Sequence, residues 1–385
     1  MTDKKLYLTR AQLISELGRC LGCKSKPCMN ACPVNCNPQE FIAKAKANDF
    51  AGAVETITRN NPMGQTCGLI CPDKFCMQAC TRAGIDFPIN IPRVQATILE
   101  KYRTAETAAH PKLPANGKKV AVIGAGPAGI AATAELSRLG YRITLFESFE
   151  KIGGALNLIP DKRLPFEVIA KDWSFIDDPD MIELRLNTPV NNPAALLEQD
   201  FDGVIVATGE PEGINLGSDG EEHAVSYLDY LRHPEHYAAR GNIAVIGGGA
   251  VATDCALTAV NNGAENVEMF VRRRVSDMRV TGEERKSLLD AGVDLTTMTK
   301  IKKIGADGDY LTLYKEKNRF NRKKFPTPPS PGPAFPWSSK PSAAPLPVSR
   351  TPTASSTPAT ANTAAPPLSK RWLREKLRPA AWTKN

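Results

Sequence analysis

The residues with the clearest capacity for chemistry are cysteines, and nine of the 10 lie between Cys20 and Cys80. One run, which begins at Cys20, has the spacing C-x2-C-x4-C-x3-C-P; the other, which begins at Cys67, has the spacing C-x3-C-P-x3-C-x3-C. Closely spaced soft thiolates select zinc, cuprous copper or iron–sulfur clusters. The sequence therefore predicts thiolate-bound inorganic centres near its start.

Spacing alone leaves three interpretations of this region open. Structural zinc requires four ligands in two C-x2–4-C pairs, and Cys20 with Cys23 would supply one half of such a site. Wider gaps that end in Cys-Pro are more typical of iron–sulfur clusters, in which the last cysteine can serve a neighbouring cluster. Disulfides are the third alternative. They are disfavoured because the chain begins without a secretory signal and has no apolar run of membrane-spanning length, so a cytoplasmic location is expected.

A dinucleotide-binding fingerprint follows the cysteines. Gly124, Gly126 and Gly129 complete G-x-G-x-x-G between an apolar strand and an alanine-rich helix. Such glycines allow a tight turn, the approach of a pyrophosphate and close packing of the helix on the strand. Glu147 ends the next strand, where a carboxylate can accept hydrogen bonds from ribose hydroxyls. This context favours a bound dinucleotide over a glycine turn without a ligand.

A second strand–turn–helix unit begins at Asn242, with Gly247, Gly249 and Ala252 in the turn. Its second strand ends in an arginine run, residues 272–274, where an acid would favour NAD. A guanidinium matches the geometry of a phosphate, so this run favours the 2′-phosphate of NADPH. A solvated basic turn is the alternative.

Composition and charge set further limits. The chain has 385 residues, enough for about two to three domains. Its net charge of +8 comes mostly from the segment after Phe325, which holds eight lysines and arginines against one acid. The remainder is nearly neutral, so no nucleic-acid partner is expected. Residues 321–385 hold 14 of the 31 prolines and predict a disordered tail.

The stretches CLGCKSKPCMNACP, NPMGQTCGLICPDKFCMQACTRAGIDFPINIPRVQ, VIGAGPAG, GGALNLIPDKRLP and FVRRRVSDMR occur in this order. Together they resemble the NADPH-oxidising part of dihydropyrimidine dehydrogenase, the bacterial NAD(P)-dependent subunit of that enzyme and, more distantly, the small subunit of glutamate synthase. The resemblance spans roughly residues 10–320. It implies a multidomain chain: an α-helical iron–sulfur domain (1–115), α/β Rossmann-like FAD (116–235) and NADP(H) (236–320) domains, and a disordered tail (321–385).

The resemblance also implies cofactors and their ligands. Two 4Fe-4S clusters are expected. The first would be held by Cys20, Cys23, Cys28 and Cys80, and the second by Cys32, Cys71, Cys76 and Gln95. Two cysteines, Cys36 and Cys67, remain spare, and either could displace Gln95. The expected FAD contacts are Gly124, Ala125, Gly126, Gly129, Glu147, Gly154, Leu156, Arg163 and Leu164, and the expected NADPH contacts are Gly249, Ala250, Arg272, Arg273 and Arg279.

The function implied is electron input: hydride passes from NADPH to FAD, and single electrons leave through two clusters to a barrel-type partner subunit that carries FMN and reduces pyrimidines. No catalytic side chain is required, because hydride transfer depends on alignment and exclusion of water. The alternatives are the glutamate synthase small subunit, a zinc-stabilised binding or assembly protein, and an inactive fragment. The inactive fragment is an alternative because a Pro-rich tail follows residue 320, as in a truncated product. In the family, the chain returns at this point to complete its FAD domain.

Overall fold

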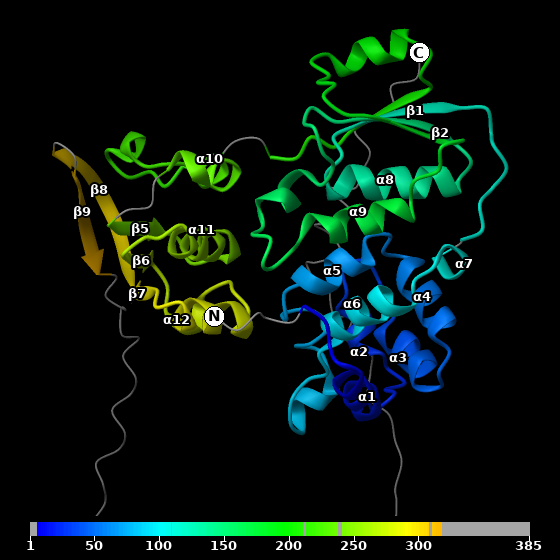
Figure 1. The fold of residues 1–385 in the computed structure, drawn as a ribbon, viewed down its shortest axis with the longest axis horizontal. Helices are drawn as coiled ribbons and strands as arrows, with labels where there is room; N and C mark the ends of the chain where they lie inside the picture. Colours follow the sequence, from blue (N-terminus) through cyan, green and yellow to red (C-terminus); the bar gives the residue numbers. More distant parts are fainter. Residues whose placement is uncertain are drawn as a thin grey trace, which may run out of the picture.

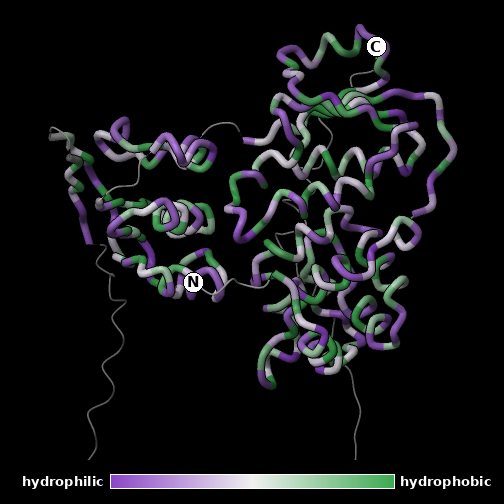
Figure 2. The backbone as a smooth tube through the Cα atoms, viewed as in Figure 1, coloured by the Kyte–Doolittle hydropathy of each residue, from purple (hydrophilic) through white to green (hydrophobic). Residues whose placement is uncertain are grey.

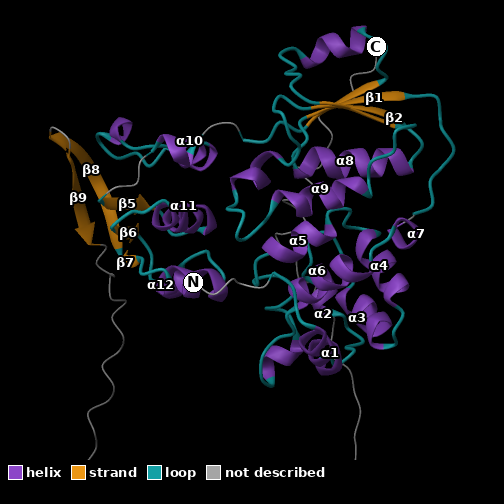
Figure 3. Cartoon of the chain, viewed as in Figure 1, coloured by secondary structure: helices purple, strands orange, loops and turns teal. Residues whose placement is uncertain are grey.

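The computed structural model describes residues 6–108, 110–210, 213, 215–237, 241–307 and 310–317. A helical region comes first, and two parallel-sheet units follow it (Figures 1 and 3). This order confirms the predicted fold class. The predicted disordered tail, residues 321–385, lies outside the described residues. None of the helices in the described part of the chain has the length and hydrophobicity that crossing a bilayer requires.

The helical region consists of short helices with polar caps. Thr9 forms a capping box with Gln12, while Asn37 and Asn90 cap two later helices through their side chains. Hydrophobic and hydrophilic residues alternate along these helices, as amphipathic packing requires (Figure 2). The helices are α1 (Arg10–Arg19), α2 (Pro27–Asn30), α3 (Pro38–Lys46), α4 (Phe50–Thr58), α5 (Gly64–Ile70), α6 (Ile91–Tyr102) and α7 (Ala105–Ala108).

The amphipathic stretch from Pro38 to Arg59 is two helices, α3 and α4, although its periodicity runs through both. Asn48 adopts a left-handed conformation with φ of 64°, which ends the first helix. Asp49 then starts the second, because its carboxylate accepts a hydrogen bond from the Gly52 N–H at 2.8 Å. Local capping thus overrides the apolar pattern.

The first sheet unit contains four parallel strands in the order β3-β2-β1-β4. Val120, Val122 and Leu145 on its central strands are buried, as expected for a sheet covered on both faces. Helix α8 follows β1, and α9 precedes β3. The elements are β1 (Lys119–Ile123), α8 (Pro127–Arg138), β2 (Arg142–Phe146), α9 (Phe166–Ser174), β3 (Ile182–Arg185) and β4 (Gly203–Val206).

The second unit repeats the strand–helix–strand pattern with three parallel strands in the order β5-β6-β7, and an antiparallel hairpin, β8 with β9, follows it. Cys255 is buried in its first long helix, as predicted for a core cysteine. The elements are α10 (Tyr227–Arg232), β5 (Asn242–Ile246), α11 (Ala250–Asn261), β6 (Asn266–Val271), α12 (Gly282–Asp290), β7 (Asp294–Thr297), β8 (Thr299–Asp307) and β9 (Tyr310–Lys317).

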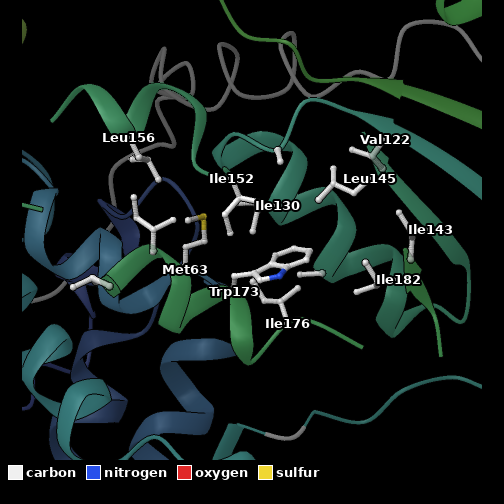
Figure 4. Close-up of a cluster of buried hydrophobic side chains, with 14 of the residues drawn as sticks. Met63, Val122, Ile130, Ile143, Leu145, Ile152, Leu156, Trp173, Ile176 and Ile182 are labelled. Atoms are coloured by element: carbon white, nitrogen blue, oxygen red, sulfur yellow. The ribbon is translucent and has the colours of Figure 1, made fainter. Parts of the chain in front are cut away.

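The helical region and the first sheet unit share one hydrophobic core. Met63 and Leu69 from the helical region belong to the same buried cluster as Val122, Leu145 and Trp173 (Figure 4). Helix α5, which carries Cys67, packs directly on α9. Helix α5 and its cysteine, Cys67, therefore pack against the first sheet unit.

Candidate redox site

The first glycine turn has the geometry of a phosphate cradle. Gly124 has φ of 100°, a conformation that favours glycine, and Gly126 is the N-cap of α8, which no side chain caps. A Cβ on Gly129 would lie 1.8 Å from the Gly124 carbonyl oxygen, so α8 packs on the turn only because residue 129 is glycine. The first N–H groups of α8 are left for an anion.

Glu147 lies beside this turn at the end of β2. It is only 5% exposed, and its carboxylate accepts a hydrogen bond from the Ala125 N–H at 2.8 Å. The other carboxylate oxygen accepts from the Phe149 N–H at 3.1 Å. These two backbone donors hold the carboxylate at the position where the sequence predicts a ribose contact.

The other expected FAD contacts divide into two groups. Gly154, with φ of 53°, faces Gly126 so closely that a Cβ on it would lie 2.9 Å from the Gly126 Cα. Leu156 and Leu164 are buried in one core cluster with Ala125. Gly154 therefore lies against the glycine turn, and the two leucines share the core that Ala125 enters.

Arg163 points to the second sheet unit instead. Its guanidinium lies 2.6 Å from the carboxylate of Asp254 on α11 and 3.1 Å from that of Glu284 on α12. Burial, opposed by Arg163 and reinforced by Glu284, raises the pKa of Asp254 to about 6. Sequence reasoning missed this contact between the units, because the acids lie more than ninety residues after Arg163 and no local pattern pairs them.

The second glycine turn is also open. Gly249 is the N-cap of α11, with Ala250 as the first helical residue, and a Cβ on Gly249 would meet nothing within 4 Å. The Arg279 N–H donates to the Gly248 carbonyl at 3.1 Å, so Arg279 lies beside the turn. Arg272 and Arg273 directly follow the neighbouring strand β6, the former exposed and the latter half-buried.

One pocket brings together the four thiols expected for the first cluster. Cys20, Cys23, Cys28 and Cys80 all line it, although Cys80 is separated from the others by more than fifty residues. Burial raises the pKa of Cys28, and the neighbouring thiolate charges of Cys20 and Cys80 raise it further. Four convergent thiols fit a 4Fe-4S cluster.

The residues expected for the second cluster include neighbours of Cys28, which lines this pocket. Burial raises the pKa of Cys76 to about 12, and the charges of Cys32 and Cys28 contribute, so these thiols are neighbours. Gln95, on α6, is 7% exposed, and its amide nitrogen donates to the Gly64 carbonyl at 2.6 Å. Cys71 is the exposed member of the set.

The two spare cysteines lie beside these residues. A hydrogen bond with Cys71, together with burial, raises the pKa of Cys67. Burial raises the pKa of Cys36, and Cys32, Cys67 and Cys76 are the charged neighbours that raise it further. We call the following five neighbouring cysteines the second thiol group: Cys32, Cys36, Cys67, Cys71 and Cys76. All ten cysteines of the chain are free thiols, so the structure contains none of the disulfides that spacing left open.

The histidines show a cluster that their sequence spacing did not predict. His233, Glu235 and His236 place their ligand atoms within 4.8 Å of one another on an exposed turn after α10. All three side chains are solvent-exposed, and nothing buried surrounds them, so we assign them no role.

Models of protein families match successive parts of the chain. A model of dihydropyrimidine dehydrogenase domain II, 4Fe-4S cluster, matches residues 1–107, an NAD(P)-binding Rossmann-like domain matches residues 122–173, and a pyridine nucleotide-disulphide oxidoreductase matches residues 178–324. Among solved structures, the thioredoxin reductase of T. acidophilum is similar with a TM-score of 0.39 and 16% identity, over 53% of this chain and 72% of that one.

Curated relatives match most of the chain. The NAD-dependent dihydropyrimidine dehydrogenase subunit PreT of Escherichia coli K12 is 34% identical over 293 residues, which cover 73% of this chain and 70% of that protein. The PreT homolog of Salmonella typhi is 35% identical over 294 residues, with the same coverage. The chain therefore belongs to the family of NAD-dependent dihydropyrimidine dehydrogenase subunits, which are NAD(P)H-dependent iron–sulfur oxidoreductases.

Proposed function

We propose that this chain is the electron-input module of a pyrimidine-reducing enzyme. In this proposal residues 1–115 bind two 4Fe-4S clusters, residues 116–235 bind FAD and residues 236–320 bind NADPH. The observation that carries the proposal is the pocket in which Cys20, Cys23, Cys28 and Cys80 converge. In the second thiol group, Cys76 neighbours Cys28, and Cys67 packs on the core of the first sheet unit. Ten free thiols suit a reducing, cytoplasmic compartment.

When bound, FAD accepts a hydride from the nicotinamide, and the clusters carry single electrons onward. The protein supplies binding and alignment. The uncapped N-terminus of α8 binds the pyrophosphate of FAD, and the carboxylate of Glu147 accepts hydrogen bonds from the ribose hydroxyls. Buried Leu156 and Leu164 exclude water beside the turn, so no acid or base is needed there.

The arginines of the second unit support NADPH as the donor. The two relatives are named as NAD-dependent. This chain has Arg272 and Arg273 directly after β6 and Arg279 beside the glycine turn. Guanidinium groups recognise a 2′-phosphate through charged hydrogen bonds that NADH cannot form. We therefore propose a preference for NADPH over NADH.

The packing supports an order for electron transfer. Cys67, in the second thiol group, packs against the core cluster that contains Ala125 and Leu156. Cys76, in the same group, neighbours Cys28 of the first pocket. Electrons would thus leave the flavin through the second cluster and reach the pocket of Cys20 last. Leu21, which lines that pocket, is exposed to solvent, where a partner subunit can receive them.

The partner in this proposal is a separate subunit with an FMN-bearing barrel that reduces the pyrimidine ring. The relatives are named as subunits of dihydropyrimidine dehydrogenase, which favours pyrimidines over the glutamate branch. The test is NADPH oxidation by the chain co-purified with its partner. Uracil or thymine should support oxidation. Turnover with 2-oxoglutarate and glutamine, and none with pyrimidines, would contradict the proposed acceptor.

A further inference from the structure

Cys36 occupies a position in the second thiol group that the expected ligand set leaves unexplained. Its side chain is only 3% exposed, and it lies between α2 and α3, directly after the Cys32 run. Its Sγ lies 3.7 Å from the side-chain oxygen of Gln95 and 3.8 Å from the carbonyl oxygen of Ile57. Cys32, Cys67 and Cys76 are its thiol neighbours.

Gln95 is oriented so that its oxygen faces this thiol. The amide nitrogen donates to the Gly64 carbonyl, and only the nitrogen can donate to a carbonyl oxygen. The oxygen, the atom that would bind iron, is therefore on the side of Cys36. With the two donor atoms 3.7 Å apart, Sγ and the amide oxygen compete for one coordination position.

The chemistry of the two donors decides between them. A thiolate is a soft anion, and iron–sulfur clusters are held predominantly by thiolates, whereas an amide oxygen is neutral and hard. A thiol buried beside iron deprotonates readily, because the metal charge stabilises the anion. The hydrogen bond from Gln95 to the Gly64 carbonyl already fixes the glutamine side chain, so its orientation does not require iron.

We propose that Cys36, and not Gln95, is the fourth ligand of the second cluster, together with Cys32, Cys71 and Cys76. This inference rests on the proposed function, since it presumes two clusters. The second cluster is then ligated by four thiolates, like the first. Its negative charge exceeds that of a glutamine-ligated cluster by one, so its reduction potential is lower and closer to that of its neighbour.

The test compares four single variants of the full chain, each purified and reconstituted without oxygen: Cys36→Ala, Cys36→Ser, Gln95→Ala and, as a matched buried thiol far from the clusters, Cys255→Ser. Iron, acid-labile sulfide and FAD are quantified, and the dithionite-reduced clusters are recorded by electron paramagnetic resonance. FAD content reports whether the fold survives.

The expected result is that Cys36→Ala alters or removes one of two cluster signals while FAD is retained, because only the neutral amide of Gln95 is left for that coordination position. Cys36→Ser should keep the iron but shift the signal and potential of one cluster, because an alkoxide replaces a thiolate as ligand. Gln95→Ala and Cys255→Ser should keep both clusters. A shifted signal in Cys36→Ser also decides the case in which Cys36→Ala fails to fold.

Two results overturn the inference. In one, Gln95→Ala loses a cluster while both Cys36 variants match the wild type. In the other, Cys36→Ser leaves both signals unchanged, whatever the alanine variants do. The proposed function fails separately: a wild-type chain that holds far fewer than about eight irons refutes the two clusters themselves.

Discussion

A buried ion pair lies in the contact between the helical region and the first sheet unit. The guanidinium of Arg103, just after α6, lies 2.6 Å from the carboxylate of Asp172 on α9, and the two side chains are 3% and 0% exposed. The same carboxylate accepts the N–H groups of Thr66 at 2.8 Å and Gln65 at 3.4 Å, both on α5. Asp172 therefore ties α5 and α6 to the flavin fold.

The substitution Asp172→Asn should destabilise the protein strongly. The change leaves a buried guanidinium without its counter-charge, which typically costs about 3–5 kcal/mol. With an unfolding entropy of about 2.1 cal/mol/K per residue over roughly 300 ordered residues, this loss lowers the melting temperature by about 5–8 °C. The two carboxylate oxygens of Asp172 accept hydrogen bonds from the two N–H groups of α5. An amide has only one oxygen, so its NH₂ group would face one of these N–H donors.

The assay measures the thermal unfolding midpoint of the protein under anaerobic conditions. The signal is the fluorescence of FAD as it is released on unfolding. Asp178→Asn is the matched control, since Asp178 forms an ion pair with Lys112, which is 49% exposed. An exposed pair is worth under about 1 kcal/mol, so this control should shift the midpoint by a few degrees at most. Equal shifts for the two variants would refute the reasoning.

The two glycine turns and the contact between the units provide three more tests. Gly129→Ala should abolish FAD binding, because its Cβ would lie 1.8 Å from a backbone carbonyl oxygen; flavin content of the purified variant measures this, and full occupancy would contradict it. Arg272→Ala combined with Arg279→Ala should lower the NADPH-over-NADH ratio of kcat/KM at least about 100-fold, since the double variant loses two charged hydrogen bonds that contribute about 1.5 kcal/mol or more each. An unchanged ratio would refute the proposed phosphate contact. The raised pKa of Asp254, about 6 against an ordinary 3.8, means that the folded state holds a proton that the unfolded state has lost. The proton on Asp254 stabilises the folded state fully below pH ~4, and this stabilisation is lost as the pH rises through ~6. The unfolding free energy should therefore fall by about 1 kcal/mol between pH 5 and pH 7. Asp254→Asn should remove that slope, and an identical slope in the variant would show that another group titrates.

The sequence predicted those features whose cause is local. The glycine turns follow from φ and close packing at a few adjacent positions, and both lie between a strand and a helix as expected. The cysteine runs indicated clusters because thiolate chemistry depends on residue type. The assignment of Cys80 to the first pocket came only from the family resemblance, since spacing cannot tell which run closes a site.

The sequence pattern could not predict contacts between residues far apart in the chain. The break between α3 and α4 is a local feature that the sequence pattern also missed, because the cap at Asp49 competes with a continuous apolar period. The Arg163 contact with Asp254 and the Arg103 contact with Asp172 join residues 91 and 69 positions apart, and their partners are set by how the units pack. The approach of Cys36 to Gln95 depends on the packing of α6 in the same way.

The central claim is that thiolates in the helical region hold clusters that receive electrons from a flavin reduced by NADPH. The most direct measurement is an anaerobic titration of the purified chain with NADPH, monitored by flavin absorbance and by electron paramagnetic resonance, after iron, acid-labile sulfide and FAD have been counted. The account predicts about eight irons, one FAD, and cluster signals that grow as the flavin band bleaches and reoxidises. A colourless protein that binds zinc, or clusters that stay oxidised while NADPH reduces the flavin, would contradict it.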